Sequence, residues 1–479
     1  MKRLLPLVLF AAFAVAAVGP IRNYDFFWHL ATGRWIVEQF ALPLTDPFAV
    51  ASDRHPWING EWLFEIVAYL AHNAIGLTGM SFVRAILAAS IFTLVYRSTS
   101  GSSEYLGVPR RGKTATPRNS EVPEVLRDTV LVTSIAFAGA MQTFDLRPSS
   151  AAMLFVVLAI AARSWLAHAI VAMLWINIHP SALLAPGIAV LSTRRVTPAF
   201  ASALALLVNP YGWRAIAAPI ELMSFVQSGA FVNAEWLPSR VTQFPLLYAC
   251  VIGGGIAFIV RRNEQGAWWR VLLFAGFAFL AIRHVRNQGL FFAAFPLLMP
   301  RIEVRERLAN IAAAIAIVFV AIGADHRLGV APERFPLQAI ARLRATQLGG
   351  NIYNADQFGG FLIWSFYPQR RVLTDGRNEL HRTYIAEYAR ARGDQRAWRA
   401  LLAKYRVDLA VDEYREPLPV IDAVTGARRV MPASLAYWSR SEWALIAHDN
   451  AAMVFARRKA FAADEIQEWE IRGVVPDAR

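Results

Sequence analysis

The sequence predicts an α-helical polytopic membrane protein that ends in a soluble α/β domain. Of its 479 residues, 56% are hydrophobic and only 18% are charged, and the mean hydropathy is +0.36. The charged residues come in clusters that are separated by apolar blocks. Soluble globular chains of this length lack such blocks. The composition therefore excludes a cytosolic enzyme, a fibrous protein and a disordered tail.

Residues 1–324 are predicted to form the membrane bundle, with about eleven spans. Several apolar segments are shorter than the ~20 residues that cross a bilayer core, so tilt, local thinning or a broken helix has to accommodate them. The expected spans are Leu4–Val18, Met80–Tyr96, Thr129–Thr143, Ser149–Ala162, Trp165–Ile178, Ala182–Leu191, Thr197–Val208, Phe244–Val260, Trp268–Ile282, Gly289–Met299 and Ile311–Gly323.

Charge sets the expected orientation of these spans. The chain has 49 basic and 35 acidic residues, a formal charge of +14, which suits either nucleic acid or cytoplasmic membrane anchors. The stretch 149–191 reads as three short spans or two longer ones. If the stretch forms three spans, all the basic clusters between spans lie on the same side of the membrane as Lys2 and Arg3. The positive-inside rule then favours three spans, a cytoplasmic N-terminus, an exported C-terminus and no nucleic-acid partner.

The first exported loop, residues 21–79, is expected to be long and structured. The run before it, Leu4–Val18, fits either a cleaved secretory signal or a first span, and the many later spans favour a span. Within the loop, Trp62–Ile75 is apolar but carries Glu65 and His72. We expect this segment to be a helix that lies in the outer interface instead of a further span.

Residues 325–479 are predicted to form an exported α/β domain. Short strands are expected at Gly350–Ala355, Phe361–Phe366, Arg371–Thr374, Val407–Val411, Trp443–Ile446 and Met453–Ala456, and helices at Arg382–Arg392 and Arg396–Lys404. A length of about 150 residues is normal for one domain. The Arg/Ser/Pro-rich stretch Ser98–Pro123 is expected to be a cytoplasmic connector.

Asp25 is the first acidic residue after the first span, and it is a candidate general base. It would deprotonate an acceptor while a donor phosphate leaves. The alternative is that Asp25 only caps a helix, since Asp is a preferred N-cap residue. His29, one helical turn further on, would share a face with Asp25 and is a candidate substrate- or phosphate-binding residue.

Four more candidate phosphate ligands map to the same outer side: Arg147, His179, Arg283 and Arg286. Exported arginines run against the positive-inside bias, and arginine binds phosphate oxygens in a bidentate manner. Arg283 and Arg286 are three residues apart and so can face one way. The alternative is that the arginines only reach lipid headgroups and that His179 only satisfies a helix end.

The sequence gives little support for nucleotide-binding, zinc or serine-nucleophile sites. The sequence lacks a phosphate-binding loop, a His-Glu-x-x-His zinc motif and a Gly-x-Ser-x-Gly nucleophile motif. The single Cys250 excludes an intramolecular disulfide. Asp46, Asp53, His55 and Glu61 could join Asp25 around a divalent cation, but their spacing follows no metal signature, so no metal ligand is assigned.

Several motifs resemble a group of bacterial membrane proteins and, more distantly, the GT-C superfamily of membrane glycosyltransferases. The opening motif Asp-x-x-Trp-His-Leu-x-x-Gly spans Asp25 to Gly33. The others are Thr45-Asp46-Pro47-Phe48, Asn59-Gly60-Glu61-Trp62-Leu63, Arg147-Pro148, Asn177-Ile178-His179, Asn209-Pro210-Tyr211-Gly212, Gly359 to Trp364, and Asp375-Gly376-Arg377.

This resemblance implies an inverting transfer of a sugar from a polyprenyl-phosphate carrier at the outer face of a bacterial inner membrane. Asp25 is similar to the first-loop aspartate of the superfamily, which acts as a base or orients the acceptor. A second acid often follows that aspartate, where this chain has Phe26, so a metal requirement stays open. The acceptor is an unidentified glycan, lipid or protein. The alternative is a non-enzymatic scaffold or lipid-glycan transporter with an exported partner-binding domain.

Overall fold

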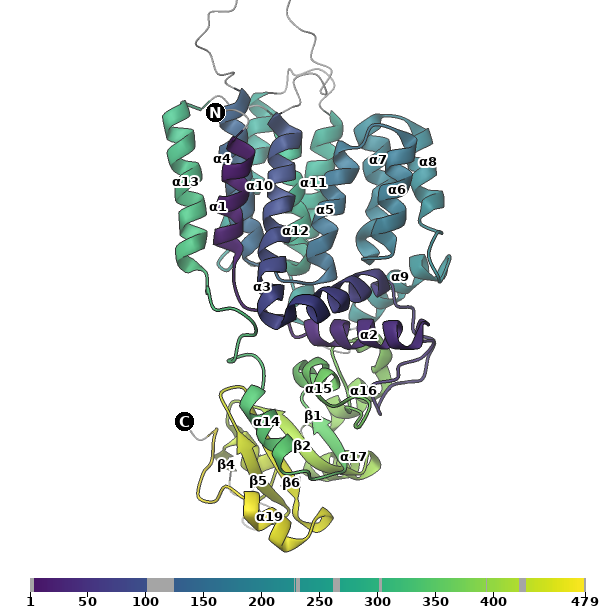
Figure 1. Ribbon diagram of the computed structural model, residues 1–479, viewed down its shortest axis with the longest axis vertical. Helices are drawn as coiled ribbons and strands as arrows, with labels where there is room; N and C mark the ends of the chain where they lie inside the picture. Colours follow the sequence, from purple (N-terminus) through teal and green to yellow (C-terminus); the bar gives the residue numbers. More distant parts are fainter. Residues whose placement is uncertain are drawn as a thin grey trace, which may run out of the picture. The chain divides into compact units, whose positions relative to one another are not determined.

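The computed structural model is rich in helices and ends in a region with a β-sheet (Figure 1). It describes residues 4–100, 125–227, 229, 233–261, 268–300, 304–392, 394–421 and 428–477. The chain divides into two compact units. Unit 1 comprises Met1–Ile21, Ile58–Phe64 and Ala71–Gly329, and unit 2 comprises Arg22–Trp57, Glu65–Leu70 and Val330–Arg479. Most of the expected connector 98–123 lies outside the described residues.

Each of the apolar segments expected to be a span contains a helix. Between residues 149 and 191 three separate helices are present, one in each of the three expected segments, and their number as membrane spans stays a prediction. The helices are α1 (Leu5–Ala17), α3 (Trp62–Ser100), α4 (Val125–Met141), α5 (Pro148–Ala161), α6 (Trp165–Ile176), α7 (Ala185–Thr193), α8 (Val196–Ala205), α10 (Pro245–Val260), α11 (Trp268–Arg283), α12 (Gln288–Leu298) and α13 (Glu306–Gly323). The sequence did not predict α9 (Arg214–Gln227), an amphipathic helix with Pro219 inside it.

Helix length is the property that distinguishes α3 from the rest. Among the described residues, α3 alone is long and apolar enough to cross a membrane, and the other apolar helices are shorter. Its backbone is not continuously helical, because Gly76 has a φ of 66° and interrupts it. This positive φ suits glycine, and it separates Trp62–Ile75 from the following apolar segment, as expected.

The helices of unit 1 pack through small residues and aromatic rings. A Cβ atom at Gly139 of α4 would lie 2.2 Å from the ring of Phe292 in α12, so only glycine allows these two helices to approach so closely. Phe13 of α1 contacts Phe137 of α4, with 4.5 Å between the ring centroids. Helices α6, α7 and α8 contact one another and lie side by side in Figure 1.

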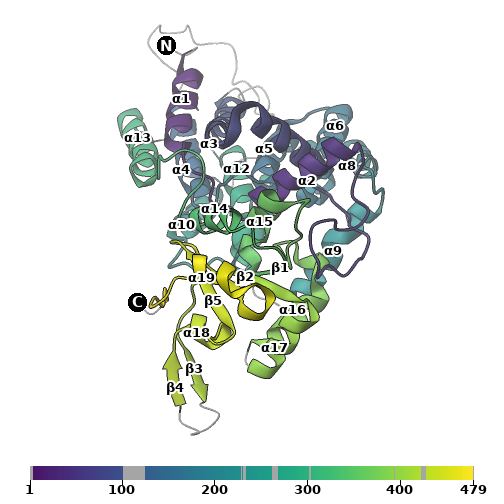
Figure 2. The same cartoon turned by 60° about the horizontal axis from the view of Figure 1, so that its bottom comes forward.

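Unit 2 contains a four-stranded mixed sheet in the order β1-β2-β6-β5. β1 (Asn351–Asn354) runs parallel to β2 (Val407–Glu413), while β6 (Ala452–Arg457) is antiparallel to both β2 and β5 (Trp443–His448). The helices are α14 (Leu337–Ala345), α16 (Arg382–Ala391), α17 (Gln395–Lys404), α18 (Ala433–Tyr437) and α19 (Ala463–Trp469). Figure 2 shows the separate hairpin of β3 (Leu418–Ile421) and β4 (Arg428–Met431), which the sequence did not predict.

Two expected strands take other forms. Phe361–Phe366 belongs to a helix, α15 (Gly359–Phe366), because a short apolar run suits a buried helix as well as a strand. The extended segment Arg371–Thr374 pairs outside the main sheet. Val372 forms an isolated parallel bridge with Ala49, supported by a 2.8 Å hydrogen bond from the Val50 N–H to the Val372 carbonyl.

Unit 2 also contains α2 (Phe26–Gln39), which two glycine contacts hold in place. A Cβ atom at Gly33 would lie 2.1 Å from the carbonyl oxygen of Glu65, so α2 packs directly on the backbone of α3. A Cβ atom at Gly360 of α15 would lie 2.9 Å from the carbonyl oxygen of Tyr24. These contacts set the position of Asp25, which precedes the first residue of α2.

Candidate functional site

Asp25 does not act as an ordinary helix cap. It occupies the N-cap position of α2, but its side chain accepts no capping hydrogen bond from the first turn. Its Oδ1 atom instead accepts a 3.1 Å hydrogen bond from the indole N–H of Trp28. A Cβ atom at Gly376 would lie 2.7 Å from the same oxygen. The carboxylate of Asp25 therefore lies against the Asp375-Gly376-Arg377 turn, where a larger residue than glycine would displace it.

The adjacent Arg377 is the centre of a buried ion-pair network. Its Nη2 atom lies 2.5 Å from Oδ2 of Asp375 and 3.0 Å from Oδ1 of Asp46, and all three side chains are buried. Burial alone would raise the pKa of Asp375, but the charges of Arg377 and His381 hold that pKa well below its usual range. Arg377 thereby joins the first loop to the late Asp-Gly-Arg motif.

Three aromatic rings surround the Arg377 guanidinium. Its carbon atom lies 4.6 Å from the ring centroid of Trp57, 5.3 Å from that of Phe48 and 5.6 Å from that of Trp28. Distances below about 6 Å allow cation–π attraction, which is strongest where water is excluded. The first-loop tryptophans Trp28 and Trp57 thus line the site of the Arg377 guanidinium.

Asp46, Asp375 and His381 are the group of possible metal ligands among the described residues, with their ligand atoms within 4.8 Å of one another. Both carboxylates already contact Arg377, and Asp46 also accepts hydrogen bonds from the N–H groups of Phe48 and Ala49. Burial opposes charging of His381, but Asp375, whose Oδ1 lies 3.6 Å from its Nε2, raises the pKa of His381. These positive charges neutralise the carboxylates, so the group fits an ion-pair network better than a metal site.

The other residues of the metal alternative lie elsewhere. The Asp53 carboxylate accepts from the N–H of Thr383, and His55 is exposed. Glu61 belongs to unit 1, where its Oε1 lies 3.9 Å from His179 Nε2. Within the described residues, none of these side chains joins Asp25 in a group of metal ligands.

His29 is buried inside unit 2. Its Nδ1 atom lies 3.3 Å from Oε1 of Glu65, and the two side chains are 2% and 0% exposed. The His29 ring also lies 3.6 Å from the indole of Trp28, measured between centroids. This contact joins α2 to the start of α3, whereas the expected phosphate-binding role of His29 stays a prediction.

Unit 1 contains a separate polar cluster that includes Arg147 and Arg286. Arg147, the N-cap residue of α5, forms an ion pair with Glu235. The guanidinium of Arg286 lies 4.5 Å from the ring centroid of Trp236, in the short 3-10 helix η2 (Ala234–Trp236). Burial would raise the pKa of Glu235, but the charges of Arg147 and Arg286 lower it, so Glu235 is ionised at neutral pH.

His179 lies beside these two arginines and is uncharged. Burial, together with the charges of Arg286 and Arg147, lowers the pKa of His179 well below its ordinary value. The Ser181 N–H donates to Nδ1 of His179 at 3.2 Å, so Nε2 carries the ring proton. Nε2 is buried and has no hydrogen-bond partner among the described residues. The imidazole can therefore donate a hydrogen bond to a ligand.

Arg283 is separate from this cluster. It ends α11 and is exposed, and none of the contacts of the described residues brings its side chain to Arg147, Glu235 or His179. The sequence also missed Glu235, because it lies in the short helix η2, which no motif marks. The Asn177-Ile178-His179 and Asn209-Pro210-Tyr211-Gly212 motifs have structural contacts. Asn177 accepts a 2.9 Å hydrogen bond from the indole N–H of Trp62, and the Asn209 amide donates to the Gly212 carbonyl across a tight turn.

The fold resembles that of an archaeal oligosaccharyltransferase. AglB from Archaeoglobus fulgidus, in complex with an inhibitory peptide and a dolichol-phosphate, matches with a TM-score of 0.54 and 10% sequence identity, over 90% of this chain and 74% of that chain. The apo form of the Archaeoglobus fulgidus oligosaccharyltransferase gives a TM-score of 0.48 at 10% identity, over 91% and 75%. No protein-family model and no curated protein matches this chain. The similarity confirms in coarse form the expected fold, a helix-rich chain with a C-terminal sheet region.

Proposed function

We propose that this chain is a glycosyltransferase that moves a sugar from a polyprenyl-phosphate carrier to an acceptor at the outer face of a bacterial inner membrane. The fold supports the general class, since AglB, with a similar fold, is an oligosaccharyltransferase. The donor, the acceptor and the role of each residue are our inference from the side chains of the two units.

The surface of unit 1 supports a membrane location. Ile315, Phe319 and Ile322 of α13 each expose more than half of their surface, at a spacing that places them on one helix face. Ile252, Ile256 and Ile259 of α10 do the same. Rows of exposed large apolar side chains are costly in water and suit contact with lipid tails.

The observation that carries the proposal is the gathering of Arg147, Arg286 and His179 around the carboxylate of Glu235. Both arginines offer guanidinium N–H donors there, while a second carboxylate, Glu61, lies 3.9 Å from Nε2 of His179. Arg147 also begins α5, and helix N-termini carry partial positive charge and unpaired N–H groups that favour phosphate. The neutral His179 adds one N–H donor. We infer that these groups bind the phosphate of the carrier.

In the proposed reaction, an acceptor hydroxyl or amine attacks the anomeric carbon of the sugar from the side opposite to the phosphate. The new bond from acceptor to carbon forms as the bond from carbon to phosphate oxygen breaks, which inverts the anomeric configuration. Asp25 takes the acceptor proton, and the polyprenyl phosphate leaves with its electron pair. Asp25 suits this role because the indole N–H of Trp28 orients its carboxylate through a 3.1 Å hydrogen bond.

Lipid binding tests the phosphate site. The full chain in mild detergent would be titrated with a polyprenyl phosphate and, separately, with the phosphate-free polyprenol, and bound lipid measured by native mass spectrometry. We expect the Arg147→Gln/Arg286→Gln variant to lose at least about tenfold in affinity for the phosphate form alone, because charge-assisted hydrogen bonds are lost. Glu235→Gln should bind it more tightly, because a competing carboxylate is removed.

Arg240→Gln is the matched control, since Arg240 is an exposed arginine of the segment between η2 and α10. It should bind both lipids like the wild type. Equal affinity of the wild type for the two lipids, or an unchanged affinity in the double arginine variant, would contradict the phosphate site and favour the scaffold alternative.

A further inference from the structure

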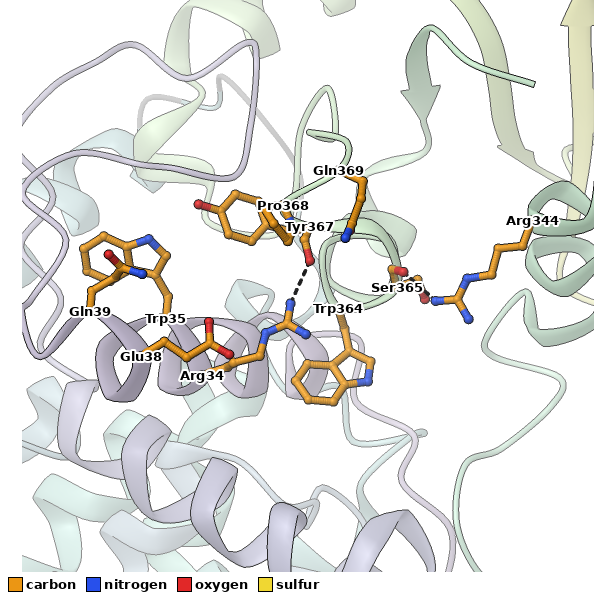
Figure 3. A pocket seen from close by; sticks show the side chains of 10 residues that line it. All are labelled: Arg34, Trp35, Glu38, Gln39, Arg344, Trp364, Ser365, Tyr367, Pro368 and Gln369. Carbon is orange, nitrogen blue, oxygen red and sulfur yellow. Dashed lines mark hydrogen bonds between the residues drawn. The ribbon is translucent and has the colours of Figure 1, made fainter. Parts of the chain in front are cut away.

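A second candidate site lies in unit 2, in a pocket of about 500 Å³ (Figure 3). Its volume is within the roughly 300–1,000 Å³ that small-molecule sites occupy. One wall is the end of α2, with Arg34, Trp35, Glu38 and Gln39. The opposite wall is the end of α15 with the segment 367–369, and the pocket is completed by Arg344 near the end of α14.

Residues near the C-terminal ends of α2, α14 and α15 line this pocket. The last carbonyl groups of a helix have no partner inside the helix and carry partial negative charge. The partial charge of three such ends nearby disfavours an anionic ligand. A ligand that donates hydroxyl hydrogens without carrying negative charge fits this electrostatic setting.

The two arginines that line the pocket both donate hydrogen bonds to carbonyls at the end of α15. Arg34 Nη2 donates a 3.0 Å hydrogen bond to the Tyr367 carbonyl, drawn in Figure 3. Arg344 Nη2 donates to the carbonyl of Ser365. Arg34 also lies 4.8 Å from the ring centroid of Trp364, and Arg344 lies 5.4 Å from that of Phe366. Their charges compensate the helix end, as basic residues commonly do.

The remaining lining combines aromatic rings with planar polar groups. Trp35, Trp364 and Tyr367 are partly exposed, and Glu38, Gln39 and Gln369 are exposed. A carboxylate only accepts hydrogen bonds, while an amide donates and accepts. The face of an aromatic ring packs against the apolar face of a ligand, so polar groups at the edge of that ligand can still form hydrogen bonds. A sugar ring presents the matching surfaces, with an apolar C–H face and hydroxyls around its edge.

We propose that this pocket binds a short neutral saccharide. It is a binding site in its own right, independent of the proposed transfer reaction and of Asp25. Stacking on an indole would supply affinity, and Glu38 with the neighbouring amides would select the hydroxyl pattern. A lipid tail does not fit, because most side chains that line the pocket are polar.

Direct binding to the full chain tests this proposal. The protein would be held in lipid nanodiscs, because sugar-headed detergents would compete for the pocket. The probes are maltose, cellobiose and N,N′-diacetylchitobiose, with glucose 6-phosphate as the anionic comparison. Saturation-transfer NMR would detect binding, and calorimetry would give Kd. We expect at least one neutral disaccharide to bind with Kd below about 10 mM, and glucose 6-phosphate to bind more weakly.

Variants assign the binding to the pocket. Trp35→Ala should weaken it about tenfold, Trp35→Phe should restore part of the affinity, and Glu38→Gln should weaken it without changing the melting temperature. Trp165→Ala is the matched control, because it removes a half-exposed tryptophan of unit 1. No saturable binding by any neutral probe would overturn the proposal. So would tighter binding of glucose 6-phosphate, or unchanged affinity in Trp35→Ala and Glu38→Gln.

Discussion

Replacement of Arg377 by methionine should strongly destabilise unit 2. The substitution keeps an apolar side chain of similar length among Trp28, Phe48 and Trp57, but it removes the charge that pairs with Asp46 and Asp375. Both carboxylates are 0% exposed, so they cannot regain water without unfolding. Removing one partner of a buried ion pair typically costs about 3–5 kcal/mol.

The assay is thermal unfolding of the full chain, followed by intrinsic tryptophan emission. In a domain of 150–250 residues, each kcal/mol shifts Tm by roughly 2–4 °C, so the expected decrease is about 6–20 °C. Trp398, Trp438 and Trp443 are buried in unit 2 and report on its unfolding. The Tm of Arg377→Lys should lie between those of the wild type and Arg377→Met, because lysine keeps the positive charge but lacks the planar guanidinium group.

A triple variant provides the decisive comparison. Arg377→Met combined with Asp46→Asn and Asp375→Asn removes the uncompensated charges, and it should recover much of the lost Tm. A wild-type Tm for Arg377→Met, or a triple variant less stable than Arg377→Met alone, would show that uncompensated buried charge does not cause the destabilisation.

Three other substitutions have defined outcomes. Gly33→Ala should destabilise unit 2 by about 1–3 kcal/mol or more, because its Cβ would lie 2.1 Å from the Glu65 carbonyl oxygen, while Gly60→Ala, with no atom within 4 Å, should melt like the wild type. Because the pKa of His381 is raised in the folded chain, its stabilising contribution is complete below about pH 6.5 and is lost as pH rises through the folded pKa. The Tm difference between wild type and His381→Asn should therefore shrink above pH 6.5, and a constant difference would contradict this pKa shift. Asp25→Asn should abolish sugar transfer from labelled membranes while polyprenyl-phosphate binding stays at the wild-type level, and full transfer by this variant would exclude Asp25 as the base.

The helices of unit 1 could be predicted from sequence because hydropathy is a local property. Phe244–Val260 is apolar throughout and Trp268–Ile282 is apolar except for Arg270, so α10 and α11 can each be located from the residues of their own segment. The wrong prediction of a strand at Phe361–Phe366 also comes from relying on local hydropathy. An apolar run of six residues has no period that separates helix from strand, and its packing against α2 decides the outcome.

The site depends on pairings that local patterns do not contain. Asp46 and Arg377 are 331 residues apart in the chain, and neither residue alone indicates the other. Asp25 was selected from sequence as a candidate base, which stays a prediction, and its contact with the Gly376 turn follows only from the fold. The ion pair of Arg147 with Glu235, 88 residues later, was missed for the same reason.

The assignment of Arg22–Trp57 to unit 2 has a consequence for the order of folding during synthesis. This segment leaves the ribosome long before β1 and the Asp-Gly-Arg turn exist. At a synthesis rate of about 5–20 residues per second, roughly 15–60 s pass between the appearance of Arg22–Trp57 and that of β1 and the Asp-Gly-Arg turn. During that interval Trp28, Phe48 and Trp57 lack their arginine, and Asp46 lacks its counter-charge. A protein fragment that starts at Val330 would lack the same partners, so a stable version of this domain requires residues 22–57 to be supplied with it.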